Sequence, residues 1–232
     1  MQENQRLYYL QKMGIQSWLL KDQKPSNDQA ILSAGLIDVV PDLVDPDLSD
    51  WDKFVSSVEQ CNRCKLGITR QAVVSGAGAQ DADCLIIGEA PNDEEGQQGI
   101  PFVGDTGHLL NEMLFSVGLN RDNVYFTNII KCCSAQGEGL DKESLTACRL
   151  YLNRQIEMIQ PRIILLLGRV AAHTLLECSD EMSELRGKVH NFILNDQNFS
   201  VIVSYHPAYY LRKPSQKRLA WQDLSVLKQQ LE

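Results

Sequence analysis

The chain has 232 residues, which is enough to bury one substantial core with a small appendage. Its composition, 44% hydrophobic and 22% charged, is that of a folded globular protein, and no apolar run approaches the roughly 20 residues of a membrane span. The net charge of −8 disfavours a uniformly basic nucleic-acid-binding protein. The N-terminal stretch lacks the apolar core and cleavage site of a signal peptide, so we expect a cytoplasmic protein.

Three regions differ in composition. Residues 1–22 are amphipathic and aromatic, and a turn-like Lys24-Pro25-Ser26-Asn27 follows them. Residues 23–58 predict an acidic linker, with one short helix near its end at 51–58. Residues 59–232 are regular and predict a single domain. Residues 206–221 carry four bases and no acid, so a local basic edge is compatible with DNA contact despite the overall charge.

Apolar runs and helical periodicity alternate along the domain. The short apolar runs that predict buried strands are residues 83–88, 124–130, 162–168 and 200–205. The segments with helical spacing are residues 107–117, 142–159, 169–177 and 216–231. Strand–helix alternation of this kind predicts an α/β fold, with a four-stranded parallel sheet and helices on both faces.

Polar side chains follow the predicted strands. Glu89 and Glu95 come after the first strand, Asn128 ends the second, and His206 directly follows the fourth. In open parallel sheets the carboxyl ends of the strands form the ligand site, so these side chains are candidates for one site. Each also has a structural alternative, because an amide can bond to loop backbone and a lone histidine is often structural.

Four of the seven cysteines are candidate metal ligands. Cys61 and Cys64 form a Cys-x-x-Cys knuckle, Cys132 ends a strand, and Cys148 lies in the following helix. Four thiolates suit tetrahedral zinc or a [4Fe–4S] cluster, and spacing alone favours neither. Cys133 is a rival for Cys132, since adjacent residues cannot both face one metal. The other two, Cys84 and Cys178, are expected to be small packed side chains.

Eight motifs in order resemble the iron–sulfur-containing, family 4 uracil-DNA glycosylases, over about Cys61 to Leu231. The motifs are CNRC, GEAPNDEE, PFVGDTGHLLNEML, TNIIKC, TACRLYL, LLLGRVAA, LRGK and YHPAYYLR. The resemblance implies the α/β/α sandwich of that superfamily and DNA containing uracil as substrate. It also implies a structural [4Fe–4S] cluster near the DNA-facing surface, held by Cys61, Cys64, Cys132 and Cys148.

The resemblance also implies roles for the candidate site residues. Phe102 would stack on an extruded uracil, although by itself it reads as a core phenylalanine at a turn. The Asn128 amide would read the Watson–Crick edge of uracil and reject cytosine. His206 would donate to uracil O2 as negative charge develops. Glu89 or Glu95 would orient or activate water and stabilise the sugar cation.

The segment after His206 would meet the DNA. It would hold the wedge that replaces the extruded base, with Tyr210, Leu211, Arg212 and Lys213 as the expected contacts. One position departs from the family motif, because Asn92 stands where glycine is usual. Glycine permits close backbone approach to the base or sugar, so a side chain there could narrow the pocket or abolish turnover. Activity is therefore the less secure part of the expectation.

The first 22 residues suggest an additional role. They resemble the chi-binding start of the psi subunit of the bacterial DNA polymerase III clamp loader, over about fifteen residues. The expected anchors are Leu7, Tyr8, Leu10, Met13, Ile15 and Trp18. The bland alternative is a helix packed on its own domain. Three functions follow: an active uracil-DNA glycosylase, a catalytically weak or inactive replisome subunit binding chi, and a zinc-stabilised DNA-binding module.

Overall fold

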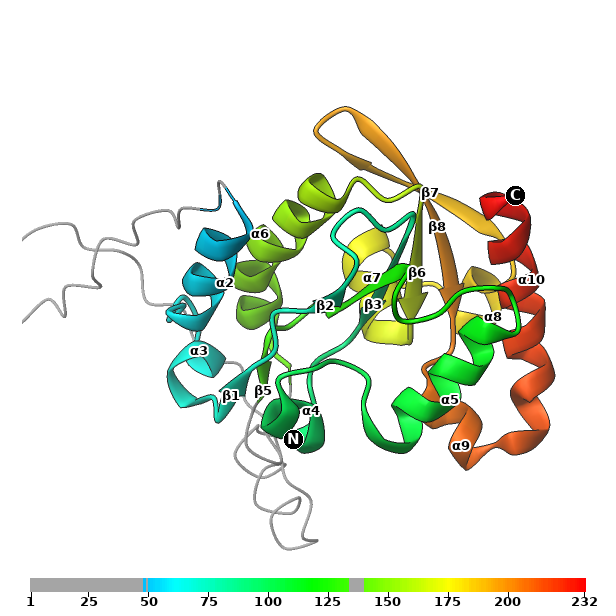
Figure 1. The fold of residues 1–232 in the computed structure, drawn as a ribbon, viewed down its shortest axis with the longest axis horizontal. Helices are drawn as coiled ribbons and strands as arrows, with labels where there is room; N and C mark the ends of the chain where they lie inside the picture. Colours follow the sequence, from blue (N-terminus) through cyan, green and yellow to red (C-terminus); the bar gives the residue numbers. More distant parts are fainter. Residues whose placement is uncertain (1–47, 49, 134–139) are drawn as a thin grey trace, which may run out of the picture. The chain divides into compact units, whose positions relative to one another are not determined.

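The computed structural model describes residue 48 and residues 50–133 and 140–232, all within one compact unit of residues 43–232 (Figure 1). The six residues expected to dock on chi lie outside this described part, as does most of the expected linker. Within the described ranges, no helix is long and apolar enough to cross a membrane.

A six-stranded mixed sheet forms the centre of the fold (Figure 1). In spatial order its strands are β2 (Ala77–Gly78), β4 (Val124–Asn128), β3 (Cys84–Gly88), β6 (Ile163–Leu167), β8 (Gln197–Ser204) and β7 (Val189–Leu194). The inner four are parallel and the two edge strands are antiparallel to their neighbours. A small second sheet pairs β1 (Ala72–Val73) with β5 (Cys132–Cys133).

Helices cover both faces, because alternate side chains of the buried strands point to opposite sides. Leu85, Ile164 and Val201 face α6 (Lys142–Ile159), α7 (Arg169–Leu176) and α8 (Met182–Leu185). Ile86, Leu165 and their neighbours face the other layer of helices. That second layer consists of α5 (Gly104–Phe115), α9 (Pro207–Arg212) and α10 (Lys217–Leu231), and η1 (Pro214–Gln216) joins the last two.

Three shorter helices flank the sheet. They are α2 (Trp51–Glu59), α3 (Lys65–Thr69) and α4 (Asp93–Gln98). The α2 helix packs on the body, because Phe54 and Val58 are buried in a cluster with Cys64 and Tyr151. The α2 helix corresponds to the short helix that the sequence predicts at residues 51–58.

The expected α/β fold is confirmed, and its four parallel strands correspond to β3, β4, β6 and β8. The sheet nevertheless has six strands, so a four-stranded sheet was too small a prediction. The missed strand β7 pairs with β8 through a two-residue turn in which Asn195 and Asp196 both have positive φ. A turn of this kind matches the twist of a β-hairpin. The strand β7 was missed because it is largely exposed and so lacks the apolar run of a buried strand.

Candidate active site

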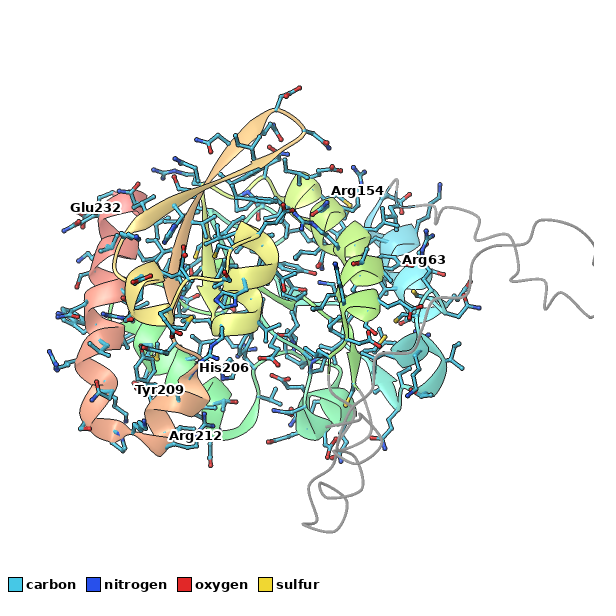
Figure 2. All side chains as sticks on the ribbon, turned by 180° about the vertical axis from the view of Figure 1, so that it is seen from behind. Arg63, Arg154, His206, Tyr209, Arg212 and Glu232 are labelled. Carbon is cyan, nitrogen blue, oxygen red and sulfur yellow. The ribbon has the colours of Figure 1, made fainter. Side chains whose placement is uncertain are left out.

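The expected site residues meet at the carboxyl end of the parallel strands. Gly88 and Asn128 end neighbouring strands and lie opposite each other in register. His206 follows β8, and Figure 2 shows His206, Tyr209 and Arg212 succeeding one another beyond that strand. The Phe102 ring reaches the same place, with its centroid 5.9 Å from that of the His206 imidazole. Phe102, Asn128 and His206 therefore belong to one site.

Gly88 gives two of these side chains the room that they need. A Cβ on Gly88 would lie 2.3 Å from Asn128 Oδ1 and 2.6 Å from Phe102 Cζ. Both distances are too short for any real contact, so only glycine lets the amide and the ring approach the end of β3 together. The ring also lies 5.9 Å from that of Phe126, which anchors it to the sheet.

Asn128 is buried and has an unsatisfied donor. The side chain is 2% exposed, and no described group accepts a hydrogen bond from its Nδ2. A buried amide N–H without a partner costs free energy, so Nδ2 has a hydrogen bond left to donate to an acceptor that enters the site. The main-chain oxygen of Asn128 accepts from the buried ammonium of Lys131, 2.7 Å away, which fixes the backbone that carries the amide.

His206 is held as a neutral imidazole. Its Nδ1 accepts a hydrogen bond from the Ala208 N–H at 3.2 Å, so the ring proton belongs on Nε2. Burial, and secondarily the positive charge of Arg212, lower the His206 pKa to about 4. At neutral pH the ring therefore presents an Nε2–H donor without a positive charge.

The two carboxylates differ in their surroundings. Glu95 is 4% exposed; its Oε2 accepts from the Asn92 N–H at 2.8 Å and its Oε1 from the Phe102 N–H at 2.5 Å. Burial raises the pKa of Glu95, while the two N–H groups and Arg121 oppose the rise. Glu89 lies at the surface end of β3, where partial desolvation raises its pKa. Glu95 thus has backbone partners on both oxygens.

Asn92 caps the helix that carries Glu95. Its Oδ1 accepts from the Glu95 N–H at 2.9 Å, and the two residues form a reciprocal capping box at the start of α4. The φ of Asn92 is −88°, which any residue adopts. The side chain is therefore engaged at the helix end, and the backbone at this position does not require glycine.

The segment after His206 offers an exposed tip. Leu211 is 40% exposed, Arg212 and Lys213 are exposed, and the Lys213 ammonium lies 5.4 Å from the centroid of the Tyr209 ring. Tyr210 was also expected to contact DNA, but its side chain is fully buried. Its hydroxyl lies 3.2 Å from Ser204 Oγ. The helical spacing of α9 turns residue 210 into the core while residues 211–213 stay outside.

The four candidate metal ligands gather in one apolar cluster. Cys64, Cys132 and Cys148 are buried there and Cys61 packs against them. The thiols also influence one another, because Cys61 contributes to the raised pKa of both Cys132 and Cys148, after the larger effect of burial. Within the described ranges, no three His, Cys, Asp or Glu side chains converge closely enough to hold a metal ion.

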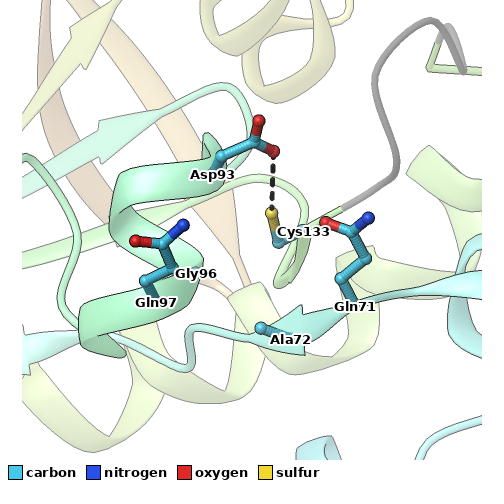
Figure 3. Close-up of a pocket in the computed structure, with 6 residues that line it drawn as sticks. All are labelled: Gln71, Ala72, Asp93, Gly96, Gln97 and Cys133. Carbon is cyan, nitrogen blue, oxygen red and sulfur yellow. Dashed lines mark hydrogen bonds between the residues drawn. The ribbon is translucent and has the colours of Figure 1, made fainter.

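Cys133 faces away from this cluster. Its sulfur lies 3.3 Å from the Asn92 carbonyl oxygen and 4.0 Å from Asp93 Oδ1. It lies in a separate cavity of about 280 Å³, lined also by Gln71 and Gln97. Figure 3 shows the Cys133 sulfur directed toward Asp93. Adjacent strand residues point to opposite sides, so Cys132 is the member of the pair that faces the other cysteines.

Three basic residues that contact the candidate residues were not among the candidates named from the sequence. The Arg70 guanidinium lies 3.7 Å from the sulfur of Cys132 and also donates to the main-chain oxygens of Cys61 and Glu59. Lys131 is fully buried, with its ammonium bonded to Thr127 and Gln155 as well as to Asn128. Arg121 contacts the loop of Phe102. Of the three, Lys131 alone had a signal in the sequence, because it follows a strand end.

Comparisons with known proteins agree with this geometry. Residues 75–225 match the family model of the uracil DNA glycosylase superfamily. A type-4 uracil-DNA glycosylase of Archaeoglobus fulgidus is 38% identical over 171 residues, covering 72% of this chain and 86% of the relative. Those of Sulfurisphaera tokodaii and Thermotoga maritima are each 33% identical, covering 78% and 74% of this chain and 85% and 89% of the relatives. The chain therefore belongs to the uracil DNA glycosylase superfamily, in its type-4 group.

Proposed function

We propose that this protein hydrolyses the N-glycosidic bond between uracil and deoxyribose in DNA, with the base extruded into the pocket of Phe102, Asn128 and His206. The observation that carries the proposal is the unsatisfied, buried Nδ2 of Asn128 beside an aromatic ring. A flipped base needs both a stacking surface and a group that reads its edge. The names of the relatives, type-4 uracil-DNA glycosylases, support the same activity.

Asn128 is proposed to select uracil. Its Nδ2 donates to uracil O4 and its Oδ1 accepts from uracil N3–H. Cytosine presents a donor at position 4 and an acceptor at position 3, so both contacts would oppose it. A buried site built around specific hydrogen bonds rejects a base that leaves its polar groups unpaired, which makes Asn128 the specificity residue.

His206 is proposed to stabilise the departing base. As the bond between C1′ and N1 breaks, the electron pair stays on uracil and charge develops on O2. The His206 Nε2–H is available to donate to that oxygen, since Nδ1 is already occupied by the Ala208 N–H. The proton stays on His206, and uracil leaves as the anion.

Glu89 is proposed to direct the water. The sugar left behind is an oxocarbenium-like cation, which a neighbouring carboxylate stabilises. Glu89 takes the proton of the water that adds to C1′, and the product is an abasic sugar with a 1′-hydroxyl. Glu95 has two backbone N–H groups as partners, so we assign it to positioning the Phe102 loop instead.

Leu211, Arg212 and Lys213 are proposed as DNA contacts. The exposed apolar side chain of Leu211 is available to fill the gap left in the base stack. Arg212 and Lys213 lie beside it and can pair with phosphates.

The four clustered cysteines are proposed to hold a [4Fe–4S] cluster. The donor set suits such a cluster, because Cys64, Cys132 and Cys148 are buried in one apolar cluster, Cys61 packs against it, and Arg70 places a positive charge beside Cys132. Such a cluster would serve as a structural clamp. It would tie the segment before β1 to β5 and α6, and so fix the loop that leads from Asn128 to Cys132.

The proposed function is tested with anaerobically purified full-length protein and a single strand that contains one uracil. Alkali treatment after incubation should cleave the strand at the uracil position, and free uracil should appear in equal amount. A strand left intact at stoichiometric protein would overturn the proposal. A matched strand with cytosine at the same position serves as the control.

A further inference from the structure

Phe102 has an unusual backbone for a residue that forms a pocket wall. Its φ of +55° lies in the left-handed region, which bulky residues rarely adopt. The other described non-glycine residues with positive φ are exposed, at helix ends or in the β7–β8 turn: Gln160, Glu177, Asn195 and Asp196. Phe102 is 1% exposed. Such a conformation persists only where the surroundings hold it, so the contacts of this peptide are informative.

Charged side chains hold the Phe102 backbone from both sides. Glu95 accepts its N–H, as described above, and Arg121 Nη1 donates to its carbonyl oxygen at 2.9 Å. The second nitrogen of the same guanidinium donates to the carbonyl oxygen of Pro101 at 2.7 Å. The rigid fork of an arginine thus reaches two successive carbonyl groups with two separate nitrogens, whereas a lysine would have to reach both with one.

Arg121 is itself fixed in place. Its Nη1 lies 3.2 Å from Asn111 Oδ1, and its guanidinium carbon lies 4.4 Å above the Phe126 ring. The loop is also fitted on the α5 side, because a Cβ on Gly107 would lie 2.0 Å from the Phe102 carbonyl oxygen. The Phe102 carbonyl oxygen is therefore held by Arg121 and packed closely against the backbone of Gly107.

From these contacts we propose that Arg121 is a positioning residue, which with Glu95 locks the Phe102 peptide in its left-handed conformation and so presents the ring to the extruded base. Arg121 reaches the loop from the segment between α5 and β4, and two of its three hydrogen bonds go to main-chain oxygens of that loop, those of Pro101 and Phe102. It therefore acts through Phe102. The inference rests on the proposed function, since it assumes that the ring stacks on uracil.

The test compares Arg121→Gln and Arg121→Lys with wild type. The control is Arg162→Gln, because Arg162 also donates to a main-chain oxygen, that of Leu231 at 3.2 Å, but lies at the start of β6. Single-turnover uracil release is measured together with affinity for uracil-containing DNA and for DNA with a stable abasic analogue. The abasic ligand has no base to stack, so it reports on the DNA surface alone.

Arg121→Gln should slow uracil release on the order of 100-fold, the scale of a slightly misplaced site, with abasic-DNA affinity within about twofold of wild type. The rate of uracil release by Arg121→Lys should lie between those of wild type and Arg121→Gln. The rate of Arg162→Gln should match that of wild type. Equal loss of affinity for both DNAs, or release within twofold of wild type, would overturn the inference. If Arg121→Gln does not fold, Arg121→Lys decides by the same criteria. Failure of wild type to release uracil would instead overturn the proposed function, and the inference with it.

Discussion

Asn92 and Glu95 hold each other in a reciprocal pair of hydrogen bonds at the start of α4. The Asn92 side chain accepts from the Glu95 N–H at 2.9 Å, and the Glu95 side chain accepts from the Asn92 N–H at 2.8 Å. The second oxygen of Glu95 then bonds to Phe102. Asn92, where the family resemblance led us to expect glycine, is thus the first member of a chain of contacts that ends at Phe102.

Replacing Asn92 with glycine tests whether this side chain narrows the pocket. We expect Asn92→Gly to change uracil release by less than threefold and to lower the free energy of unfolding by only a few tenths of a kcal/mol, the usual cost of glycine at a helix N-cap. Single-turnover release and urea unfolding measure the two effects. A gain in activity of about tenfold or more would show that Asn92 obstructs the pocket.

Adding one methyl group at Gly88 should close the site. The Cβ of Gly88→Ala would collide with Asn128 Oδ1 and Phe102 Cζ, so the amide and the ring must move apart. We expect uracil release to fall at least about 100-fold. Gly118→Ala is the control, because a Cβ there meets nothing within 4 Å, although its positive φ adds some strain. Activity of Gly88→Ala near that of the control would contradict the pocket described.

His206 should titrate far below an ordinary histidine. Burial lowers its pKa to about 4, against about 6.5 in an unfolded chain. In that interval the unfolded chain binds a proton that the folded protein does not, so the free energy of unfolding falls as pH decreases from about 6.5 toward 4. NMR of ¹⁵N-labelled histidine should show His206 neutral at pH 6, with its proton on Nε2. A midpoint near 6.5, or a proton on Nδ1, would refute this state of the ring.

Asp223, on α10, bonds to Ser204, which lies two residues before His206. Its carboxylate is fully buried, 2.8 Å from the Arg186 guanidinium and 2.7 Å from Ser204 Oγ. Asp223→Ala leaves the mostly buried charge of Arg186 without its carboxylate, so we expect it to lower the free energy of unfolding by about 3 kcal/mol. Lys228→Ala, which removes an exposed ion pair with Glu232 at 3.8 Å, should cost less than about 1 kcal/mol. Urea unfolding measures both losses, and similar values in the two variants would contradict a stabilising role for the buried Asp223 carboxylate.

Adjacent cysteines provide a matched test of the metal site. Cys132 faces the cysteine cluster and Cys133 faces the separate cavity beside Asp93. We expect anaerobic wild type and Cys133→Ser to be brown and to contain about four irons per chain, as a [4Fe–4S] cluster requires. Cys132→Ser should lose iron and melt at a lower temperature. Iron content that is equal in the two serine variants, or zinc in wild type, would refute the proposed ligand set.

The sequence was most informative where burial is uniform. The strands β3, β4 and β6 are buried at every residue, as is β8 from Val201 to Ser204, and the α6 helix has the predicted bounds, Lys142–Ile159. The edge strand β7 has one buried residue, Phe192, with exposed or half-buried residues on either side, and its hairpin turn has no glycine to reveal it. Tyr210 was misplaced because a strand-end motif does not tell which face of the following helix is buried.

The sequence predicts which residues stand at the strand ends, but it does not predict the hydrogen bonds that fix their side chains. Glu89, Asn128 and His206 stand at the ends that the sheet brings together. The loop of Phe102 depends on Arg121, 19 residues later in the chain, and no local pattern joins the two. The tautomer of His206 likewise depends on one backbone N–H, that of Ala208, which only the turn of α9 positions.

The most direct test of the uracil pocket is single-turnover uracil release by wild type and Asn128→Ala from the same uracil-containing strand. Because the variant removes the amide that we propose reads the base, we predict rapid release by wild type and release at least about 100-fold slower by the variant, with unchanged affinity for abasic DNA. Equal rates of uracil release by the two proteins would contradict the proposed uracil site around Asn128.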